Sequence, residues 1–394
     1  MCSFGICLVF NCGIKNGPRK TRPLQDQHCM TKPVVVHVID SLARGGAETL
    51  LINLLPELNK MYEIILVTLT SESDFDEENI ICKKRYSLGY KGSKSIISCA
   101  WALRKIIKAH APALVRAQLY TSSLIARMAT PRKIPFVFSI HTFQGIENYT
   151  KNKFSLPLEK ITYHKRHHLI GVSNQAIADF NKHVGIKGPT YTLYNFINPI
   201  YFEYSRLANK IDLKNLRLIA VGNLKAVKNY GYLIEAFQQL KQYAVSLDIY
   251  GEGPLRSALQ QAIDQAGVAV TLKGSCKEIY KIMPAYDLYV MSSLYEGFGI
   301  APVEAMATGL PLLLADLPVL KEVTHGNALF FDQLHSQNFV RLIKEIMEGK
   351  CNLKALSEKG MELARKHYRK EEYVGRLQHI YQQVMEKKVT APVQ

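Results

Sequence analysis

Short runs of β-branched and aliphatic residues alternate with longer helical stretches through the first half of the chain. Strands are predicted at Val34–Ile39, Ile64–Thr70, Ala113–Ala117, Pro135–Ile140 and His168–Val172, and helices at Glu48–Asn59, Ser93–His110 and Asn174–His183. Continuous apolar runs of this length indicate strands that are buried on both faces, as in parallel sheets covered by helices. The pattern therefore predicts a doubly wound α/β domain.

The same alternation restarts after a polar, irregular stretch at Asn195–Asn215, where Pro199 stops any helix. The second series has predicted strands at Leu216–Val221, Val245–Tyr250, Val268–Leu272, Asp287–Met291 and Pro311–Leu314, and helices at Tyr230–Gln242, Leu255–Ala266, Ile300–Thr308 and Gln337–Glu348. A chain of 394 residues is long enough for two such domains. We predict a leader at 1–29, domains at 30–200 and 201–368, and a C-terminal helix at 369–394 that packs back on the first domain.

The leader does not look like a targeting segment. No basic residue precedes its apolar run at Phe4–Phe10, and no small-residue cleavage site follows it, so we interpret it as a disordered or start-site extension. No apolar run in the chain approaches the ~18 residues of a membrane-spanning helix. The sequence therefore predicts a cytoplasmic protein.

Basic residues outnumber acidic ones, which gives a formal net charge of +17. No acidic residue occurs between Glu78 and Glu147, whereas that stretch holds twelve cations: Lys83, Lys84, Arg85, Lys91, Lys94, Arg104, Lys105, Lys108, Arg116, Arg127, Arg132 and Lys133. A segment of one sign attracts anionic surfaces. We expect the protein to rest at the inner face of the cell membrane; the alternative is an ordinary solvated surface. No nucleic-acid recognition motif is present, and no nucleic-acid partner is predicted.

One segment carries the clearest chemical signal. Residues 296–311 read Glu-Gly-Phe-Gly-Ile-Ala-Pro-Val-Glu-Ala-Met-Ala-Thr-Gly-Leu-Pro, directly after a predicted strand and at the start of a predicted helix. The amides of residues 297–300 are expected at that helix N-terminus, where N–H groups lack partners within the helix and can bind ligand oxygens. Glu296 and Glu304 flank this loop.

This segment resembles the retaining GT-B glycosyltransferases of family 4, also called glycosyltransferase group 1. The resemblance implies two Rossmann-like domains that face each other across a cleft and bind a nucleotide diphosphate sugar without a metal ion. It further implies that Glu296 holds hydroxyls of the donor sugar and that Glu304 accepts from the ribose. The implied donor-binding residues are Gly45, Gly46, Asn223, Lys225, Lys228, Gly274, Glu296, Gly297, Phe298, Gly299, Ile300 and Glu304.

A second segment, Gly222–Asn229, follows the first strand of the second domain. Family members usually have Gly-Arg-Leu-x-x-x-Lys-Asn there, so Lys228 is expected to neutralise the donor diphosphate. Asn223 departs from the pattern and removes a guanidinium that could bind phosphate through two parallel hydrogen bonds. We suggest Lys225 as the replacement charge. Without the resemblance, two lysines in a loop indicate only solvated surface.

In the first domain, Gly45 and Gly46 resemble the family's Gly-Gly-x-Glu loop, which lies across the cleft from the donor phosphates. His141 ends a predicted strand, and the resemblance suggests that it approaches the transferred sugar; a purely structural histidine is the alternative. The predicted catalytic residues are thus Glu296, His141 and Lys228. Gly274 belongs to a turn expected near the base.

The predicted function is sugar transfer, with retention, from a nucleotide diphosphate sugar to a glycan or lipid-linked glycan. A UDP-sugar is favoured over a GDP-sugar, and the pathway is biosynthesis of lipopolysaccharide, capsule or exopolysaccharide. No cofactor and no metal site are expected, since Asp74 and Asp76 lie in an acidic loop. The alternatives are a sugar-nucleotide epimerase of the same fold and a non-catalytic basic binding subunit, the latter suggested by Asn223.

Overall fold

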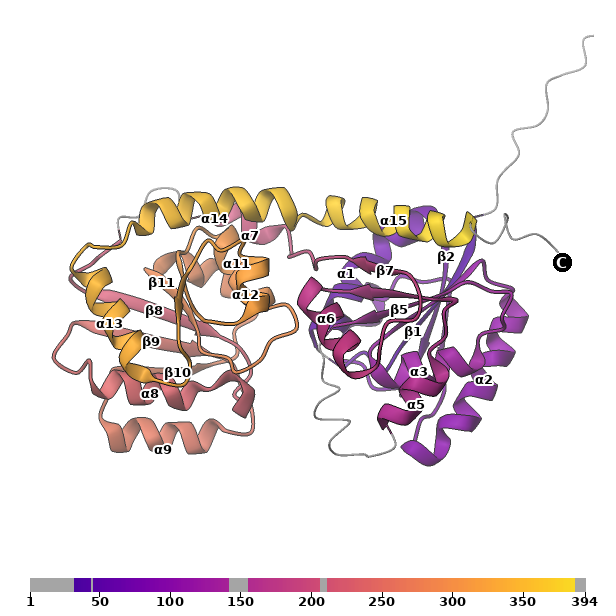
Figure 1. Cartoon of the computed structure of the whole chain (residues 1–394), viewed down its shortest axis with the longest axis horizontal. Coiled ribbons are helices and arrows are strands. Elements are labelled where there is room, and N and C mark those ends of the chain that lie inside the picture. The colour runs from indigo at the N-terminus through magenta and orange to yellow at the C-terminus, as the bar shows by residue number, and fades with distance from the viewer. Residues whose placement is uncertain (1–31, 44, 142–154, 206–210, 387–394) are drawn as a thin grey trace, which may run out of the picture. The chain divides into compact units, whose positions relative to one another are not determined.

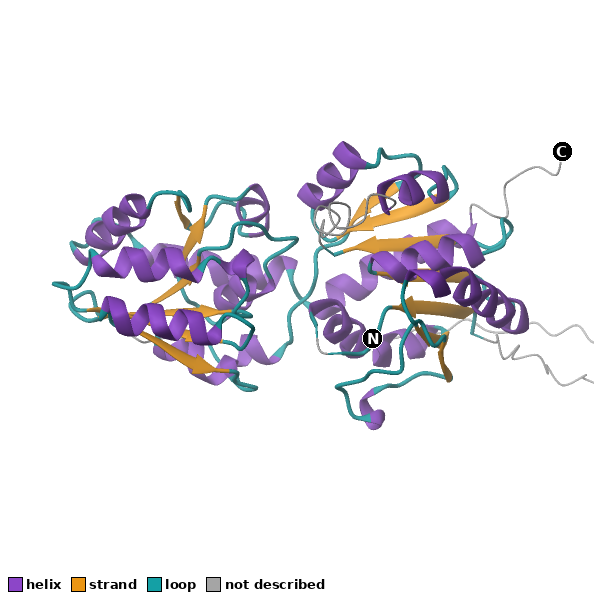
Figure 2. Cartoon of the chain, turned by 90° about the horizontal axis from the view of Figure 1, so that it is seen from below, coloured by secondary structure: helices purple, strands orange, loops and turns teal. Residues whose placement is uncertain are grey.

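The computed structural model describes residues 32–43, 45–141, 155–205 and 211–386. The predicted leader at 1–29 and the end of the predicted C-terminal segment, 387–394, lie outside this range. The described residues from Pro33 to Glu386 form one compact unit that contains two separate parallel sheets (Figure 1). Helices lie on both sides of each sheet (Figure 2), which is the doubly wound arrangement that the sequence predicts.

The first sheet has seven strands in the order β3-β2-β1-β4-β5-β6-β7. These are β1 Val34–Ile39, β2 Glu63–Thr68, β3 Lys84–Ser87, β4 Leu114–Gln118, β5 Phe136–Ile140, β6 His167–Gly171 and β7 Thr190–Thr192. The connecting helices include α1 Gly46–Met61, η1 Glu77–Asn79, η2 Ser93–Ser95, α2 Ile96–His110, α3 Tyr120–Ala129, α5 Ser155–Thr162, α6 Asn174–His183 and α7 Ile200–Glu203.

The second sheet has six strands in the order β10-β9-β8-β11-β12-β13. They are β8 Leu216–Val221, β9 Val245–Tyr250, β10 Val270–Gly274, β11 Leu288–Met291, β12 Leu312–Ala315 and β13 Leu329–Phe331. Its helices are η3 Ala226–Lys228, α8 Tyr230–Gln238, α9 Arg256–Ala266, α10 Ile279–Ile282, η4 Met283–Ala285, α11 Ile300–Ala307, α12 Pro318–Val323, α13 Ser336–Met347 and α14 Leu353–His367, followed by α15 Lys370–Glu386. No helix in the described part of the chain has both the length and the apolarity needed to cross a bilayer.

The described elements of the first domain that were not predicted include the strands β3 and β7 and the helices α3 and α5. The edge strand β3 has the polar sequence Lys-Arg-Tyr-Ser and exposes three of its four residues, so it lacks the apolar run of a buried strand. The strand β7 is only three residues long. The helix α3 follows its N-cap residue Leu119, whose φ of 72° is unusual for a residue other than glycine. The side chain of Leu119 makes no capping hydrogen bond to the helix. Each element depends on pairing or packing that local sequence does not encode.

The last helix belongs to the core of the first domain. Tyr373, Leu377, Ile380 and Val384 of α15 are buried in one cluster with apolar residues of α1 and of strands β1 and β2. Figure 1 shows α15 beside α1 on this side of the sheet. The opposite face is covered by α2, α3 and α6. The first sheet is therefore closed on one side by a helix from the other end of the chain.

Two arginines predicted among the basic surface residues are buried, which corrects that prediction. Arg116 in β4 is 1% exposed and donates to the Tyr381 hydroxyl at 3.0 Å and to the Tyr373 hydroxyl at 3.3 Å, both on α15. Arg127 of α3 is also buried and forms a 2.5 Å ion pair with Glu159. Their flanking residues supply the apolar surroundings, so neither cation contributes to the surface charge.

The chain passes between the two domains twice, after β7 and again between α14 and α15. The two crossing segments are joined by a hydrogen bond from the amide of Ile197 to the carbonyl of Tyr368, 3.1 Å long. The rings of Phe196 and Tyr373 meet edge to face with centroids 5.0 Å apart. These contacts hold the start of α15 to the first crossing segment.

We predict that Tyr381→Phe lowers the free energy of unfolding by about 1–3 kcal/mol, because it removes one acceptor of the buried Arg116 guanidinium and the hydroxyl that bonds to His37. Urea unfolding followed by circular dichroism measures this loss. Tyr280→Phe is the matched control, since among the described residues that hydroxyl bonds only to the exposed Glu278, and its loss should change stability by less than about 0.5 kcal/mol. Equal stabilities of the Tyr381→Phe variant and the wild type would contradict the prediction.

Candidate active site

The two segments singled out in the second domain meet at one edge of its sheet. Strands β8 and β11 are adjacent and parallel, so the loops at their carboxyl ends emerge side by side. The amide of Leu294 donates to the carbonyl of Val227 at 2.8 Å, and the Ser292 hydroxyl donates to the carbonyl of Lys228, also at 2.8 Å. The loops at residues 222–229 and 292–300 therefore form one unit.

An ion pair joins the two predicted catalytic residues of this unit. The ammonium of Lys228 lies 2.6 Å from Oε1 of Glu296, with side chains that are 20% and 13% exposed. The hydroxyl of Ser293 donates to the same oxygen at 2.7 Å. Among the described residues, Oε2 of Glu296 has no partner, and the Lys228 ammonium has two further protons to donate. Each group can therefore bind a ligand while the ion pair between Lys228 and Glu296 stays intact.

The turn into α11 presents unused main-chain donors. Gly299, the N-cap residue, has a φ of 81°, and a Cβ atom there would lie 2.8 Å from Cδ2 of Leu320, so only glycine fits without rearrangement. The N–H groups of residues 297–300 donate to no other residue that the structure describes. Free amides at a helix N-terminus attract anions and hydroxyl oxygens.

The side chain of Phe298 anchors this turn. It is 4% exposed, and its ring lies 6.2 Å from that of Tyr194 and 5.9 Å from that of Tyr368. The carbonyl of Gly297 accepts a hydrogen bond from the Ser173 hydroxyl at 2.9 Å. Ser173, whose hydroxyl oxygen also accepts from the amide of Ala176 at the start of α6, therefore holds this turn as well. With its side chain and one carbonyl held, the turn keeps its amides oriented.

Glu304 has a different environment from Glu296. It lies on α11 and accepts a hydrogen bond from the hydroxyl of Tyr201 in the segment between the domains. Burial raises the pKa of the Glu304 carboxyl to about 7, because the charged form loses hydration. Burial and the nearby carboxylate likewise raise the pKa of Tyr201 above its usual value. The Tyr201 contact was not predicted, since no local pattern marks it.

The other predicted residues of the second domain lie at the same edge. Asn223 and Lys225 are exposed in the loop after β8. Gly274 ends β10 with a φ of 77°, and its carbonyl accepts from the amide of Gly251 at 2.8 Å. Gly251 in turn packs so closely against the carbonyl of Gly222 that a Cβ would lie 2.0 Å from that oxygen. Close backbone packing thus brings the three loops together.

In the first domain, His141 directly follows β5. Burial, with a contribution from Arg116, lowers the pKa of His141 to about 3, so its imidazole is neutral at physiological pH. Its buried Nε2 has no hydrogen-bond partner among the described residues. Gly45 and Gly46 begin α1 as predicted, with the carboxylate of Glu48 folded back over Gly45.

A hollow at the carboxyl edge of the first sheet was not anticipated from the sequence. Its lining consists of Asp40, Ser41, Leu69, Thr70, Glu72, Tyr90 and Thr121. Asp40 accepts from the amide of Ser122 at 2.8 Å, and burial raises the pKa of its carboxyl. The buried hydroxyl oxygen of Thr70 has no partner among the described residues. The position of Asp40 just after the first strand was the one available signal.

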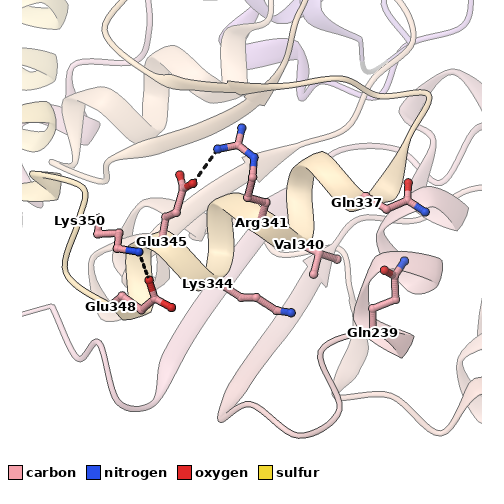
Figure 3. A pocket seen from close by; sticks show the side chains of 8 residues that line it. All are labelled: Gln239, Gln337, Val340, Arg341, Lys344, Glu345, Glu348 and Lys350. Carbon is pink, nitrogen blue, oxygen red and sulfur yellow. Dashed lines mark hydrogen bonds and ion pairs between the residues drawn. The ribbon is translucent and has the colours of Figure 1, made fainter.

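A second hollow lies on α13, away from both sheet edges (Figure 3). Four of its charged side chains form ion pairs: Arg341 pairs with Glu345 at 2.7 Å and Lys350 with Glu348 at 2.5 Å. We assign no ligand to this surface. Within the described residues, no group of three or more His, Cys, Asp or Glu side chains is arranged to hold a metal ion.

Comparison with known families agrees with this geometry. Residues 44–200 match the family described as Glycosyltransferase Family 4, and residues 203–363 match the family described as Glycosyl transferases group 1. The two matches together include every described strand of both sheets except β1. The chain belongs to the family 4, group 1 glycosyltransferases.

Individual relatives of this glycosyltransferase are distant. The Bacillus subtilis (strain 168) protein EpsF, named as a glycosyltransferase, is 25% identical over 310 residues, which cover 72% of this chain and 79% of EpsF. The N-acetylgalactosamine-N,N'-diacetylbacillosaminyl-diphospho-undecaprenol 4-alpha-N-acetylgalactosaminyltransferase of Campylobacter jejuni is 26% identical over 294 residues, or 71% of this chain and 79% of that protein.

The crystal structure of Anabaena HepE in complex with UDP superposes with a TM-score of 0.76 at 18% identity, covering 89% of this chain and all of that chain. Such a likeness concerns the fold, and it confirms the predicted GT-B architecture of two Rossmann-like domains. The roles of individual residues in this glycosyltransferase stay predictions.

The raised pKa of Glu304 leads to a prediction about stability. An acid whose pKa is higher in the folded than in the unfolded state stabilises the fold when protonated, and this stabilisation is lost as the pH rises from its unfolded value through about 7. Glu304→Gln mimics the protonated acid. We therefore expect the variant to match the wild type at about pH 5 and to be more stable by about 1–3 kcal/mol at about pH 8.

Urea unfolding at the two pH values measures this difference. The control is Glu358→Gln, because the Glu358 side chain is 63% exposed and faces only Lys354. If the difference in stability between Glu304→Gln and the wild type were the same at about pH 5 and at about pH 8, the prediction would be wrong.

Proposed function

We propose that this glycosyltransferase moves a sugar from a UDP-sugar to a lipid-linked glycan, with retention and without a metal ion, in surface polysaccharide biosynthesis. The observation that carries the proposal is the Lys228–Glu296 pair beside the free amides of residues 297–300. The bound UDP in HepE supports the choice of base, and the diphospho-undecaprenol acceptor in the name of the Campylobacter relative supports the acceptor class.

The donor diphosphate is bound by cations and amides. Lys228 supplies a partly buried ammonium, and the exposed Lys225 supplies the second charge that family members obtain from an arginine at the position of Asn223. A positive environment stabilises the leaving diphosphate more strongly in the transition state than in the ground state, because negative charge develops on it as the bond breaks. The two lysines perform the role that a divalent cation has in other transferases.

The donor sugar and the ribose are bound by separate carboxylates. Oε2 of Glu296 and the amides of Phe298 and Gly299 are positioned to take sugar hydroxyls, whereas Glu304 takes the ribose hydroxyls in place of its bond to Tyr201. Glu296 already accepts from Lys228 and Ser293, which weakens it as a nucleophile. We therefore propose same-face displacement through an oxocarbenium-like ion pair, which accounts for retention without a covalent intermediate.

The acceptor is proposed to bind at the carboxyl edge of the first sheet. The hollow there offers the carboxyl of Asp40, the unpaired hydroxyl of Thr70 and the ring of Tyr90, a combination that suits sugar hydroxyls. His141 lies at the same edge and is neutral, so it can contact the reacting sugar by hydrogen bonding but carries no charge at physiological pH.

The proposal is tested by incubating the purified chain with radiolabelled UDP-sugars and GDP-sugars and with a membrane lipid extract. Transfer of label from a UDP-sugar to lipid is expected, with an unchanged rate in EDTA and the donor's anomeric configuration in the product by NMR. Conversion of the donor without any acceptor would instead support the epimerase. Absence of turnover with every donor would support the binding subunit.

Substitutions of the two lysines are predicted to lower kcat by different factors. We expect Lys228→Met to lower kcat by about a hundredfold or more, because it removes a partly buried charge from the leaving group. Lys225→Met should lower kcat by about tenfold, because Lys225 is exposed and its charge is screened more strongly by solvent and salt. Lys241→Met serves as control, because Lys241 is exposed after α8 and belongs to neither loop of the site. Steady-state kinetics that show Lys225→Met equal to the wild type would exclude Lys225 as the replacement for the missing arginine.

Substitutions of the two glutamates should affect different kinetic parameters. Glu304→Ala removes ribose binding, which is equal in the ground and transition states, so it should raise the donor KM with little change in kcat. Glu296→Ala removes contacts to the reacting sugar and should mainly lower kcat and relax discrimination between UDP-sugars. Similar changes in both parameters for the two variants would contradict this division of roles.

A further inference from the structure

The helix α2 exposes large apolar side chains on its outer face. Ile97 and Trp101 are 75% and 63% exposed and lie one helical turn apart. The opposite face, with Cys99, Leu103 and Ile107, is buried against the first sheet. An exposed Ile–Trp pair on a helix that is otherwise well packed has no role in the core.

Cations surround this apolar pair. With about 100° of rotation per residue, Ile97, Trp101, Arg104, Lys105 and Lys108 fall within an arc of about 100° on the outside of α2, and the exposed Lys94 lies in the turn η2 directly before it. We call these six residues the α2 face. The ammonium of Lys105 lies 3.7 Å from the centre of the Trp101 ring, and Arg104 donates to the carbonyl of Ala129 on α3. The α2 face is therefore rigid, apolar at its centre and positive around it.

The neighbouring helices α3 and α5 add further exposed apolar residues, and basic residues follow α3. Met128 on α3 is 39% exposed and Ile161 on α5 is 72% exposed, and Arg132 and Lys133 follow α3. The layer of α2, α3 and α5 lies along one side of the first sheet (Figure 1). The sequence from 79 to 146 contains no acidic residue, so the α2 face and its surroundings attract negative charge without local repulsion.

We infer that the α2 face docks this protein onto the surface of an anionic lipid bilayer. Tryptophan and isoleucine enter the boundary between headgroups and acyl chains, while lysine stems extend their charged ends to lipid phosphates. A helix with this composition lies in the plane of the membrane surface and does not span it. An anionic bilayer complements both the charge and the apolar centre of the α2 face.

The inference rests on the proposed lipid-linked acceptor, and it explains how such an acceptor reaches the enzyme. Tyr90, which lines the hollow at the edge of the first sheet, precedes α2 by five residues. Docking of α2 brings that edge to the level of the headgroups, where the sugars of a lipid-linked glycan are found. The membrane then supplies the acceptor by two-dimensional diffusion.

The chain contains a built-in probe, since Trp101 is its single tryptophan. The full chain is mixed with vesicles of phosphatidylcholine, with or without phosphatidylglycerol, at low and high salt. We expect a blue shift of tryptophan emission with the anionic vesicles at low salt, and its loss at high salt or with neutral vesicles. Binding without a shift would place the contact elsewhere and overturn the inference, as would failure to bind.

Flotation of variants provides the second measurement. Ile97→Glu/Trp101→Glu and Lys94→Glu/Lys105→Glu/Lys108→Glu should each reduce vesicle binding by at least about tenfold. The controls change equally exposed residues of the second domain: Leu334→Glu, where the side chain is 73% exposed, and Lys241→Glu/Lys354→Glu/Lys366→Glu. Equal flotation of the α2 variants and the wild type would overturn the inference.

Donor binding separates this inference from the proposed function. Both α2 variants should keep wild-type affinity for UDP, because no residue of the α2 face belongs to the donor site; a loss of UDP affinity in them would contradict a role confined to docking. A wild type that docks through α2 but transfers no sugar would leave the docking inference intact while contradicting the proposed function.

Discussion

Parallel pairing of the strands constrains everything else in this molecule. In both sheets the described strands pair only in parallel, so each connection must cross over and all carboxyl ends of one sheet gather at one edge. Residues 222–229 and 292–300 are far apart in sequence, yet they touch because β8 and β11 are neighbours. The pairing of those two strands, rather than any single loop, assembles the site.

The polar edges of the two sheets differ in charge. The edge of the second sheet combines Lys225, Lys228 and unused amides around Glu296, which suits a diphosphate bearing a sugar. The hollow at the edge of the first sheet contains Asp40 and Glu72, which suit neutral hydroxyls. Exposed positive charge in the first domain is found instead on the outer side of α2, at Arg104, Lys105 and Lys108. One domain thus separates ligand recognition from its long-range attraction to anionic surfaces.

Much of this arrangement could be predicted from the sequence. The features that could not be predicted share one physical reason. Central strands and the turn at Gly299 follow from apolar runs and from glycine at a backbone position that requires it. The edge strand β3, the burial of Arg116 and the contact between Tyr201 and Glu304 depend on partners distant in sequence. Arg116 looks like a surface cation locally, and its burial depends on hydrogen bonds to Tyr373 and Tyr381 of α15 and to Ser139.

The position of α15 also sets the order in which the protein can form during its synthesis. The core of the first domain includes Tyr373, Leu377 and Val384, so this domain is incomplete while the ribosome makes the entire second domain. Until α15 emerges, the apolar surface that it covers and the guanidinium of Arg116 lack their partners. The core of the first domain therefore cannot be complete before residues 370–386 have been made, and an exposed apolar surface of this kind favours aggregation until then.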